Sequence, residues 1–281
     1  MHLNDSTLDH LRLVADLPDL TATQYEVEAE IGRGGVGVVY AAFDRRLERR
    51  VAIKVLDGTL PQVRLADEAR VMAKLEHPAI VPIYDAGTLP DGRAYYAMKL
   101  VDGTRLDRYL ASNPSLSERL RVIQSVGEAL AFAHSRGVIH RDIKPQNIMI
   151  GSFGEVYVMD WGVEGVAGTP HFRAPEQGAP NVRSDVFSLG ALLASILPER
   201  PPQALRAIAA KAMSPDTASR YPNVRELLLD IKRFQDGFAV QAHRETVWQK
   251  TARFAVRNRV LLLLLAAYVA VRFFLFFLRG V

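Results

Sequence analysis

His140-Arg141-Asp142-Ile143-Lys144-Pro145-Gln146-Asn147 is the stretch of this chain with the most specific combination of residues. It follows the pattern H-R-D-x-K-P-x-N, in which six positions are specified. At about one chance in twenty per position, the pattern arises by accident on the order of once in 10⁵ chains of this length. A turn whose charged side chains are merely solvated is the alternative interpretation. The carboxylate, the ammonium group and the amide oxygen instead indicate proton transfer, anion stabilisation and binding of a hard metal ion.

The pattern resembles the catalytic loop of protein kinases, and the Lys two residues after the Asp is typical of their serine/threonine branch. The resemblance implies that Asp142 orients the attacking hydroxyl group and accepts its proton. It also implies that Lys144 stabilises charge on the γ-phosphoryl group and that Asn147 is a metal ligand. The cofactors it implies are ATP and Mg²⁺, with Mn²⁺ as a substitute.

A glycine-rich segment, residues 31–40, contains the spacing G-x-G-x-x-G. In a chain with 19 glycines this spacing is weak by itself. Apolar residues around it predict strands, whereas a dinucleotide-binding turn would need a helix directly after the glycines. The segment resembles the loop of protein kinases whose backbone N–H groups approach the phosphates of ATP. The implied nucleotide contacts are Ile31, Gly32, Arg33, Gly34, Gly35, Val36, Gly37, Val38 and Val39.

Val51-Ala52-Ile53-Lys54 resembles the V-A-I-K strand of kinases, in which the lysine holds the α- and β-phosphates. The resemblance implies that a Glu on the next helix, predicted over 65–75, pairs with Lys54. Glu68 is the preferred partner, and it would complete the catalytic set with Asp142 and Lys144. Because the link from Lys54 to Glu68 is short for the family, Asp67 is a second candidate.

Met98-Lys99-Leu100-Val101 resembles the hinge that binds adenine in kinases. The resemblance implies that the carbonyl of Lys99 and the amide of Val101 contact the base. Val39 and Ala52 would cover its two faces, which would give an apolar slot with few polar contacts.

Two further motifs follow in the order that the resemblance predicts. Asp160-Trp161-Gly162 stands where kinases usually have Asp-Phe-Gly, which makes Asp160 the second expected Mg²⁺ ligand beside Asn147. Ala174-Pro175-Glu176 matches A-P-E, and Arg220 is the expected partner of Glu176. Asp185 resembles the helix residue that anchors the backbone of the catalytic loop.

The apolar pattern of the chain changes from strand-like to helical along the sequence. Runs at 36–40, 51–55, 80–86 and 94–101 predict antiparallel strands, and 117–136, 184–197, 202–213 and 223–236 predict helices. The resemblance implies an α+β, two-lobed protein-kinase-like fold, similar to the bacterial eukaryote-like (Hanks-type) serine/threonine kinases. The predicted parts are an extension over 1–24 and a kinase domain over 25–237, divided into an N-lobe (25–101) and a C-lobe (102–237).

Two segments are shorter than the resemblance predicts. From Asp160 to Glu176 the chain has 17 residues, and Thr169 is their only Ser or Thr. The region after Asp185 is also compressed. We expect a serine/threonine protein kinase with a protein substrate, and a nucleotide-binding pseudokinase scaffold is the alternative. A small-molecule kinase is disfavoured by Lys144 together with the A-P-E motif.

The C-terminal part of the chain is basic and then strongly apolar. Residues 238–281 carry seven Lys or Arg against one acidic residue, Glu245, which favours a membrane surface over nucleic acid as the partner. Residues 260–278 contain one charge, Arg272, and as a helix of about 28 Å they predict a single transmembrane pass. A buried helix over 260–271 is the alternative. The basic juxtamembrane segment 238–259 predicts a cytoplasmic kinase domain, and self-association is left open.

Overall fold

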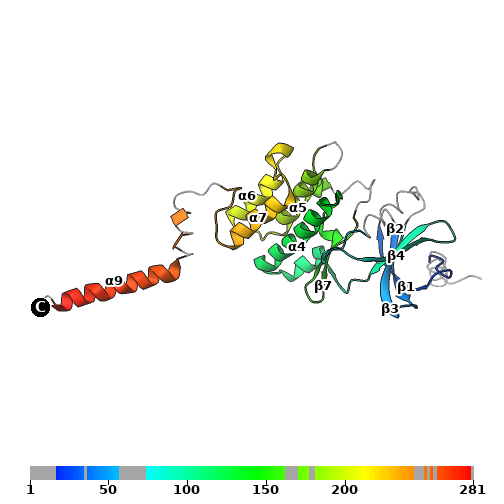
Figure 1. Ribbon diagram of the computed structural model, residues 1–281, viewed down its shortest axis with the longest axis horizontal. Coiled ribbons are helices and arrows are strands. Elements are labelled where there is room, and N and C mark those ends of the chain that lie inside the picture. Colours follow the sequence, from blue (N-terminus) through cyan, green and yellow to red (C-terminus); the bar gives the residue numbers. More distant parts are fainter. Residues whose placement is uncertain are drawn as a thin grey trace, which may run out of the picture.

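The computed structural model describes residues 17–34, 37–56, 74–161, 170–176, 181–243, 250–251, 254–255 and 258–279. Within them a β-sheet lobe is followed by a helical lobe, and a separate helix ends the chain (Figure 1). This is the α+β, two-lobed arrangement that the resemblance predicts. The predicted helix over 65–75, which contains Asp67 and Glu68, lies largely outside the described residues.

Five antiparallel strands form the sheet of the N-lobe in the order β1-β2-β3-β5-β4. They are β1 (Tyr25–Gly34), β2 (Gly37–Asp44), β3 (Arg49–Leu56), β4 (Ile83–Thr88) and β5 (Ala94–Lys99). Val39 lies opposite Lys54, and Ala52 lies opposite Met98. Because residues directly opposite one another share a face of the sheet, these four side chains belong to one surface.

The strand predicted over 80–86 differs from the observed one. Ile80 makes only an isolated parallel bridge to Val158, and β4 begins at Ile83. Pro82 explains the late start, since it has no N–H to donate to a strand ladder. Its carbonyl oxygen instead accepts a hydrogen bond from the N–H of Lys99 at 3.1 Å.

The opposite face of the sheet carries a separate apolar core. Tyr25, Tyr40 and Ile53 are buried there, and Leu20 joins them with only 4% of its surface exposed. Leu20 belongs to the predicted extension 1–24. The described end of that extension therefore packs on the N-lobe.

Four helices build the core of the C-lobe: α4 (Leu116–His134), α5 (Val182–Ile196), α6 (Gln203–Ala212) and α7 (Val224–Gln235). The helical predictions are confirmed to within two residues at each end. Polar caps set two of the starts, because Ser115 with Glu118 and Asn181 with Ser184 form reciprocal hydrogen bonds.

Short elements complete the C-lobe. A three-stranded sheet of β6 (Gly103–Arg105), β7 (Ile148–Gly151) and β8 (Val156–Val158) lies beside the helices. The remaining pieces are α3 (Leu106–Tyr109), η1 (Leu110–Ser112), η2 (Pro145–Asn147), η3 (Pro170–Phe172) and η4 (Thr217–Ser219).

The C-lobe continues beyond residue 237, the predicted end of the kinase domain. Val240 is buried in the helical core with 6% of its surface exposed. The buried carboxylate of Asp230 on α7 accepts hydrogen bonds from the N–H groups of Gln241 at 2.7 Å and Ala242 at 3.0 Å. Residues as far as 243 of the predicted juxtamembrane segment 238–259 therefore belong to the folded lobe.

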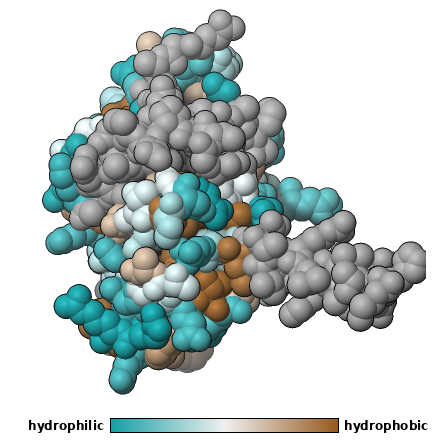
Figure 2. All heavy atoms as spheres, turned by 90° about the vertical axis from the view of Figure 1, so that its right-hand side faces the viewer, coloured by the Kyte–Doolittle hydropathy of each residue, from teal (hydrophilic) through white to brown (hydrophobic). Residues whose placement is uncertain are grey.

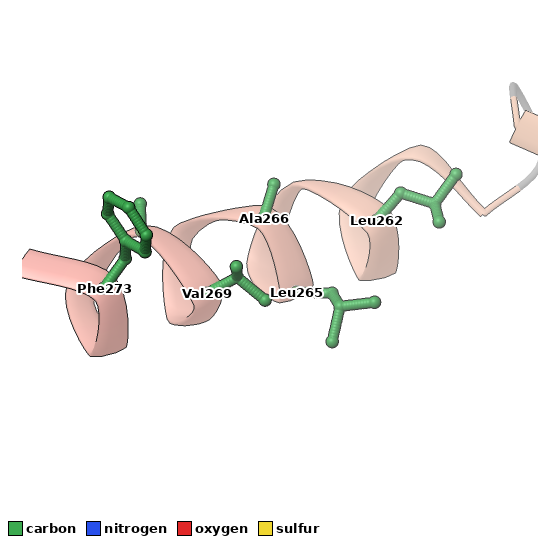
Figure 3. A pocket seen from close by; sticks show the side chains of 6 residues that line it. Leu262, Leu265, Ala266, Val269 and Phe273 are labelled. Atoms are coloured by element: carbon green, nitrogen blue, oxygen red, sulfur yellow. The ribbon is translucent and has the colours of Figure 1, made fainter. Parts of the chain in front are cut away.

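The last helix, α9 (Arg259–Arg279), stands apart from both lobes in Figure 1. Its apolar side chains are exposed, including Leu263 at 68%. Figure 3 shows the side chains of Leu262, Leu265, Ala266, Val269 and Phe273 following one another along this helix. The described surface at the N-lobe end is, by contrast, mostly hydrophilic (Figure 2).

Among the described residues, no helix is both long enough and apolar enough to cross a membrane. The transmembrane helix predicted over 260–278 is therefore not supported.

Candidate active site

A buried aspartate on α5 holds the loop between α4 and β7. The carboxylate of Asp185, which has no exposed surface, accepts hydrogen bonds from the N–H groups of His140 at 2.8 Å and Arg141 at 2.9 Å. Nε2 of His134 lies 2.7 Å from the same carboxylate. Buried backbone N–H groups need hydrogen-bond partners, and the carboxylate of Asp185 supplies them. The prediction that Asp185 anchors this loop is confirmed.

His140 connects the loop to the segment that follows β8. Its Nε2 lies 3.0 Å from the carbonyl oxygen of Met159, and its ring packs against the buried Trp161 at a centroid distance of 4.6 Å. Burial lowers the pKa of His140, although Asp185 opposes this shift. The imidazole is therefore neutral at pH 7 and acts as a structural link between the two segments.

Asp142, Lys144 and Asn147 converge within this loop. Nζ of Lys144 lies 2.7 Å from Oδ2 of Asp142, and Nδ2 of Asn147 donates to the same oxygen at 2.9 Å. A second bond from Nδ2 of Asn147 reaches the carbonyl oxygen of Asp142 at 2.8 Å. The carboxylate of Asp142 is thus held by two donors while 28% of the side chain remains exposed. It is oriented, and a hydroxyl group can still reach it.

The two lobes meet at an ion pair between residues far apart in the sequence. Nζ of Lys54 on β3 donates to Oδ1 of Asp160 at 2.7 Å, and the Lys54 side chain is only 6% exposed. Burial of Asp160 by itself would raise the pKa of its carboxyl group. The charge and hydrogen bond of Lys54 outweigh burial, so the pKa of Asp160 is lowered. Asp160 is therefore ionised at neutral pH. Glu68, the predicted partner of Lys54, lies outside the described residues.

Strained backbone occurs at two positions of this site. Arg141 has φ of 74° and Asp160 has φ of 54°, both in the left-handed region that residues with a Cβ rarely adopt. Such conformations cost on the order of 1 kcal/mol or more each and are concentrated at functional sites. The packing of His140 and Trp161 and the bonds to Asp185 maintain them here.

An apolar cluster, termed the apolar slot, shares with Lys54 one face of the N-lobe sheet. Ala52 and Met98 are buried in one cluster, and Val39, Val101 and Met149 pack against it. This places the predicted residues Val39, Ala52 and Val101 together, next to the end of β5 at Lys99. Met149 was not predicted, because its contact with this cluster depends on the packing of β7 against the N-lobe.

The glycines of residues 31–40 have different surroundings. A Cβ added to Gly32 or Gly34 would meet nothing within 4 Å, whereas one added to Gly37 would lie 2.2 Å from the carbonyl oxygen of Val55. Gly37 is therefore required by the sheet itself. Gly32 and Gly34 border open space, and Gly35 and Val36 lie outside the described residues.

The other predicted nucleotide contacts on this loop have mixed positions. Ile31 is 51% exposed, and Arg33 pairs with Glu30 on the same strand at 2.7 Å. Val38 packs against the core on the outer face of the sheet, so its side chain points away from the apolar slot. Only the backbone of Val38 can contribute to a nucleotide site.

An ion pair fixes the end of the 160–176 segment. The guanidinium of Arg220 donates to both carboxylate oxygens of Glu176, at 3.0 and 2.8 Å, and to the carbonyl oxygens of Ser214 and Arg183. The hydrogen bond from Arg220 lowers the pKa of Glu176 to about 2. The predicted pairing of these two residues is confirmed, while Gly162 and Thr169 lie outside the described residues.

A family model for the protein kinase domain matches residues 25–219, which is most of the chain. The chain belongs to the protein kinase family. Two curated kinases illustrate the similarity. One is the serine/threonine-protein kinase PknD of Protochlamydia amoebophila, 30% identical over 76% of this chain and 30% of its own length. The other is the serine/threonine-protein kinase PknB of Mycobacterium tuberculosis, 33% identical over 78% of this chain and 44% of its own length. The chain thus spans less than half of these relatives.

Membership of the kinase family implies ATP and a divalent cation, and the residues present fit both. The apolar slot suits a flat base, and the buried Lys54 suits phosphate. The two hydrogen bonds of Asn147 come from its Nδ2, so its amide oxygen remains for a cation, and Asp160 keeps one carboxylate oxygen beyond that bound by Lys54. Oxygen ligands of this kind suit Mg²⁺. Within the described ranges, no group of three or more His, Cys, Asp or Glu lies close enough together to hold a metal ion.

Proposed function

We propose that this kinase is a serine/threonine protein kinase that transfers the γ-phosphate of MgATP to hydroxyl groups of a protein substrate. The observation that carries the proposal is the arrangement of Asp142, Lys144 and Asn147, with Asp142 held by two donors and still accessible. The names of the relatives, which are serine/threonine-protein kinases, support the choice of substrate class.

Each residue has a role that follows from its position. Asp142 orients the attacking hydroxyl and accepts its proton, because its carboxylate is held in place by Lys144 and Asn147 and remains exposed. Lys144, 2.7 Å away, stabilises the negative charge that develops beside Asp142. Lys54 holds the phosphates of ATP. Asp160 holds the cation that would neutralise their charge. The slot formed by Val39, Ala52 and Met149 excludes water from the base.

The proposal predicts that Asp142→Asn abolishes phosphate transfer. The expected loss is about 10³-fold, within the range for removing a catalytic base, because the amide cannot accept the hydroxyl proton. The measurement is transfer of labelled phosphate from ATP to the kinase itself and to a generic protein substrate. Asp236→Asn, which changes an exposed aspartate after α7, is the matched control and should transfer at the wild-type rate.

A pseudokinase scaffold is the second candidate. It is favoured by the short segment from Asp160 to Glu176, which has only 17 residues to present a substrate. If wild type binds nucleotide but transfers no more phosphate than Asp142→Asn, the scaffold replaces the enzyme as the proposed function.

We also propose that α9 attaches the kinase to a lipid bilayer, with the catalytic domain on the cytoplasmic side. The exposed apolar side chains of α9, such as Leu261, Leu263 and Leu264, support an apolar environment, since each would lose unfavourable contact with water there. Lys250 and Arg259 precede the apolar run and would face anionic head groups.

Membrane attachment is tested by fractionation. The full chain should sediment with membranes after a high-salt wash, and a chain ending at residue 255 should remain in the supernatant. Leu263→Asp with Leu264→Asp should release the full chain as well, because charged groups in hydrocarbon cost about 2.5 to 3.5 kcal/mol each. Recovery of the unmodified chain in the supernatant would contradict the proposal.

A further inference from the structure

A pocket of about 400 Å³ lies behind the hinge and adjoins the apolar slot. Its walls come from residues 75–83, from Lys99 at the end of β5 and from Tyr157 on β8. Met98 and Lys99 are consecutive on β5, so their side chains point to opposite faces of the strand. Met98 belongs to the apolar slot and Lys99 lines this second pocket, while Ile83 and Tyr157 contribute to both. The volume is within the range of small-molecule sites.

One wall of the pocket carries hydrogen-bond donors. Nζ of Lys99 donates to the hydroxyl oxygen of Tyr157, and the ammonium lies 4.6 Å from the centroid of the tyrosine ring. This hydrogen bond, helped by nearby charges such as Glu155, raises the pKa of Lys99 and keeps it charged. An ammonium group has three N–H donors and Tyr157 takes one, while the hydroxyl hydrogen of Tyr157 is itself available to donate. The wall can therefore bind an anion from two sides.

The other walls are mostly apolar. Leu75 and Ile80 are buried, and Ile83 and two prolines complete the lining. His77 is neutral because burial lowers its pKa, and its Nδ1 accepts a hydrogen bond from the N–H of Ala79 at 3.1 Å. Among the described residues that line the pocket, Glu76 carries negative charge, and its exposed side chain is screened by solvent.

We propose that this pocket, termed the hinge pocket and formed by Leu75, His77, Ile80, Ile83, Lys99 and Tyr157, binds a small molecule with an apolar body and one carboxylate. The carboxylate accepts hydrogen bonds from Lys99 and Tyr157, and the apolar body fills the space between Leu75, Ile80 and Ile83. An occupant of the hinge pocket would contact Lys99, whose backbone belongs to the hinge, and Tyr157, whose strand β8 leads to Asp160. These two contacts connect the hinge pocket to the nucleotide site. The second part of the inference rests on the proposed function: a small molecule bound in the hinge pocket changes the affinity of the kinase for nucleotide.

Binding is tested with 4-phenylbutyrate and its neutral analogue 4-phenylbutanamide, titrated calorimetrically into the full chain without nucleotide. We expect the carboxylate to bind at least 10-fold more tightly than the amide, since the charged hydrogen bonds are the stronger ones. Lys99→Met should weaken 4-phenylbutyrate at least 10-fold, and Tyr157→Phe about 3-fold. The matched control is Lys211→Met, because Lys211 also lies over a tyrosine, Tyr221, at 4.2 Å but is far from the pocket. It should bind like wild type.

Two outcomes would overturn the site: equal affinity for acid and amide, or Lys99→Met binding like wild type. Ile83→Phe provides a second variant that fills the pocket without removing a charge, and it should also abolish binding. Each variant is first shown to unfold cooperatively at a temperature near that of wild type.

The regulatory part has a separate readout. Saturating 4-phenylbutyrate should change the affinity for ADP at least 3-fold, and ADP should change the affinity for 4-phenylbutyrate by the same factor. Unchanged ADP affinity would refute the coupling. If the wild-type chain binds 4-phenylbutyrate but transfers no more phosphate than Asp142→Asn, the pocket stands and the kinase proposal fails. Transfer without probe binding would do the reverse.

Discussion

At the scale of single residues, the same amino acid serves different purposes in one loop. Gly37 lies so close to β3 that any Cβ would collide with the carbonyl oxygen of Val55 at 2.2 Å. Gly32 and Gly34 have no neighbour within 4 Å of an added Cβ among the described residues, so that part of the fold does not require glycine there. A ligand that approaches the backbone closely is the remaining reason for glycine at those two positions.

This contrast predicts opposite effects for two similar substitutions. Gly34→Ala should weaken ADP binding about 10-fold while the unfolding free energy changes by less than about 0.5 kcal/mol, the range for open surface positions. Gly37→Ala should destabilise the N-lobe by about 1 to 3 kcal/mol, because backbone must move to admit the methyl group. Calorimetric titration and chemical unfolding measure the two quantities. A Gly34→Ala variant that loses stability but keeps nucleotide affinity would refute the assignment.

The ion pair of Glu176 and Arg220 also acts at this scale. The pKa of Glu176 is lowered from 4.5 to about 2, so its ionised form is favoured by the folded state. The corresponding stability is present above about pH 4.5 and is lost as the pH falls toward 2. A shift of this size corresponds to about 3 kcal/mol.

Glu176→Gln should therefore lower the unfolding free energy by about 3 kcal/mol at pH 7, where Arg220 loses its charged partner. The difference from wild type should shrink steadily between pH 4.5 and pH 2. Denaturant unfolding at several pH values measures it, and Glu199→Gln, at an exposed position after α5, serves as the control. A difference that does not depend on pH would show that the pair contributes through shape alone.

At the scale of elements, the segment after α7 is part of the C-lobe. Asp230 binds the N–H groups of Gln241 and Ala242, and it also accepts a hydrogen bond from the hydroxyl of Tyr221 at 2.8 Å. Tyr221 is the neighbour of Arg220. The end of the lobe and the end of the 160–176 segment are thus connected through one buried carboxylate.

The position of the true boundary can be tested by truncation. A chain ending at residue 237 loses the buried Val240 and two hydrogen bonds to Asp230, which leaves a buried carboxylate short of donors. We expect it to be about 2 to 4 kcal/mol less stable than a chain ending at 243. Denaturant unfolding of both chains in parallel decides the point, and equal stability would place the boundary at 237.

At the scale of the whole molecule, side-chain hydrogen bonds join the two lobes. In the part of the chain that the structure describes, Lys54 with Asp160 and Lys99 with Tyr157 link N-lobe strands to the segment around β8. Among the residues whose burial is described, none from the helix α9 belongs to the buried cores of the two lobes.

Removal of α9 should accordingly leave the domain intact. A chain ending at residue 255 is expected to unfold within about 1 °C of the full chain in the same detergent, since no core contact is lost. Differential scanning calorimetry measures both. A large drop in the unfolding temperature would mean that α9 packs on the lobes and would weaken the proposal of membrane attachment.

Much of this architecture was determined by the sequence alone, because the deciding features are local. The catalytic-loop pattern, the strand and helix periodicities and the order of motifs predicted the family and the elements. The strand predicted from residue 80 begins only at Ile83, after Pro82. The local apolar pattern also did not indicate that the buried core extends to Val240. Proximity between distant segments could only come from tertiary structure. Lys54 and Asp160 meet across the lobes, Met149 joins the apolar slot from β7, and the hinge pocket exists because residues 75–83, Lys99 and Tyr157 converge. The physical reason is that periodicity reports which face of an element is buried, whereas packing decides what that face meets.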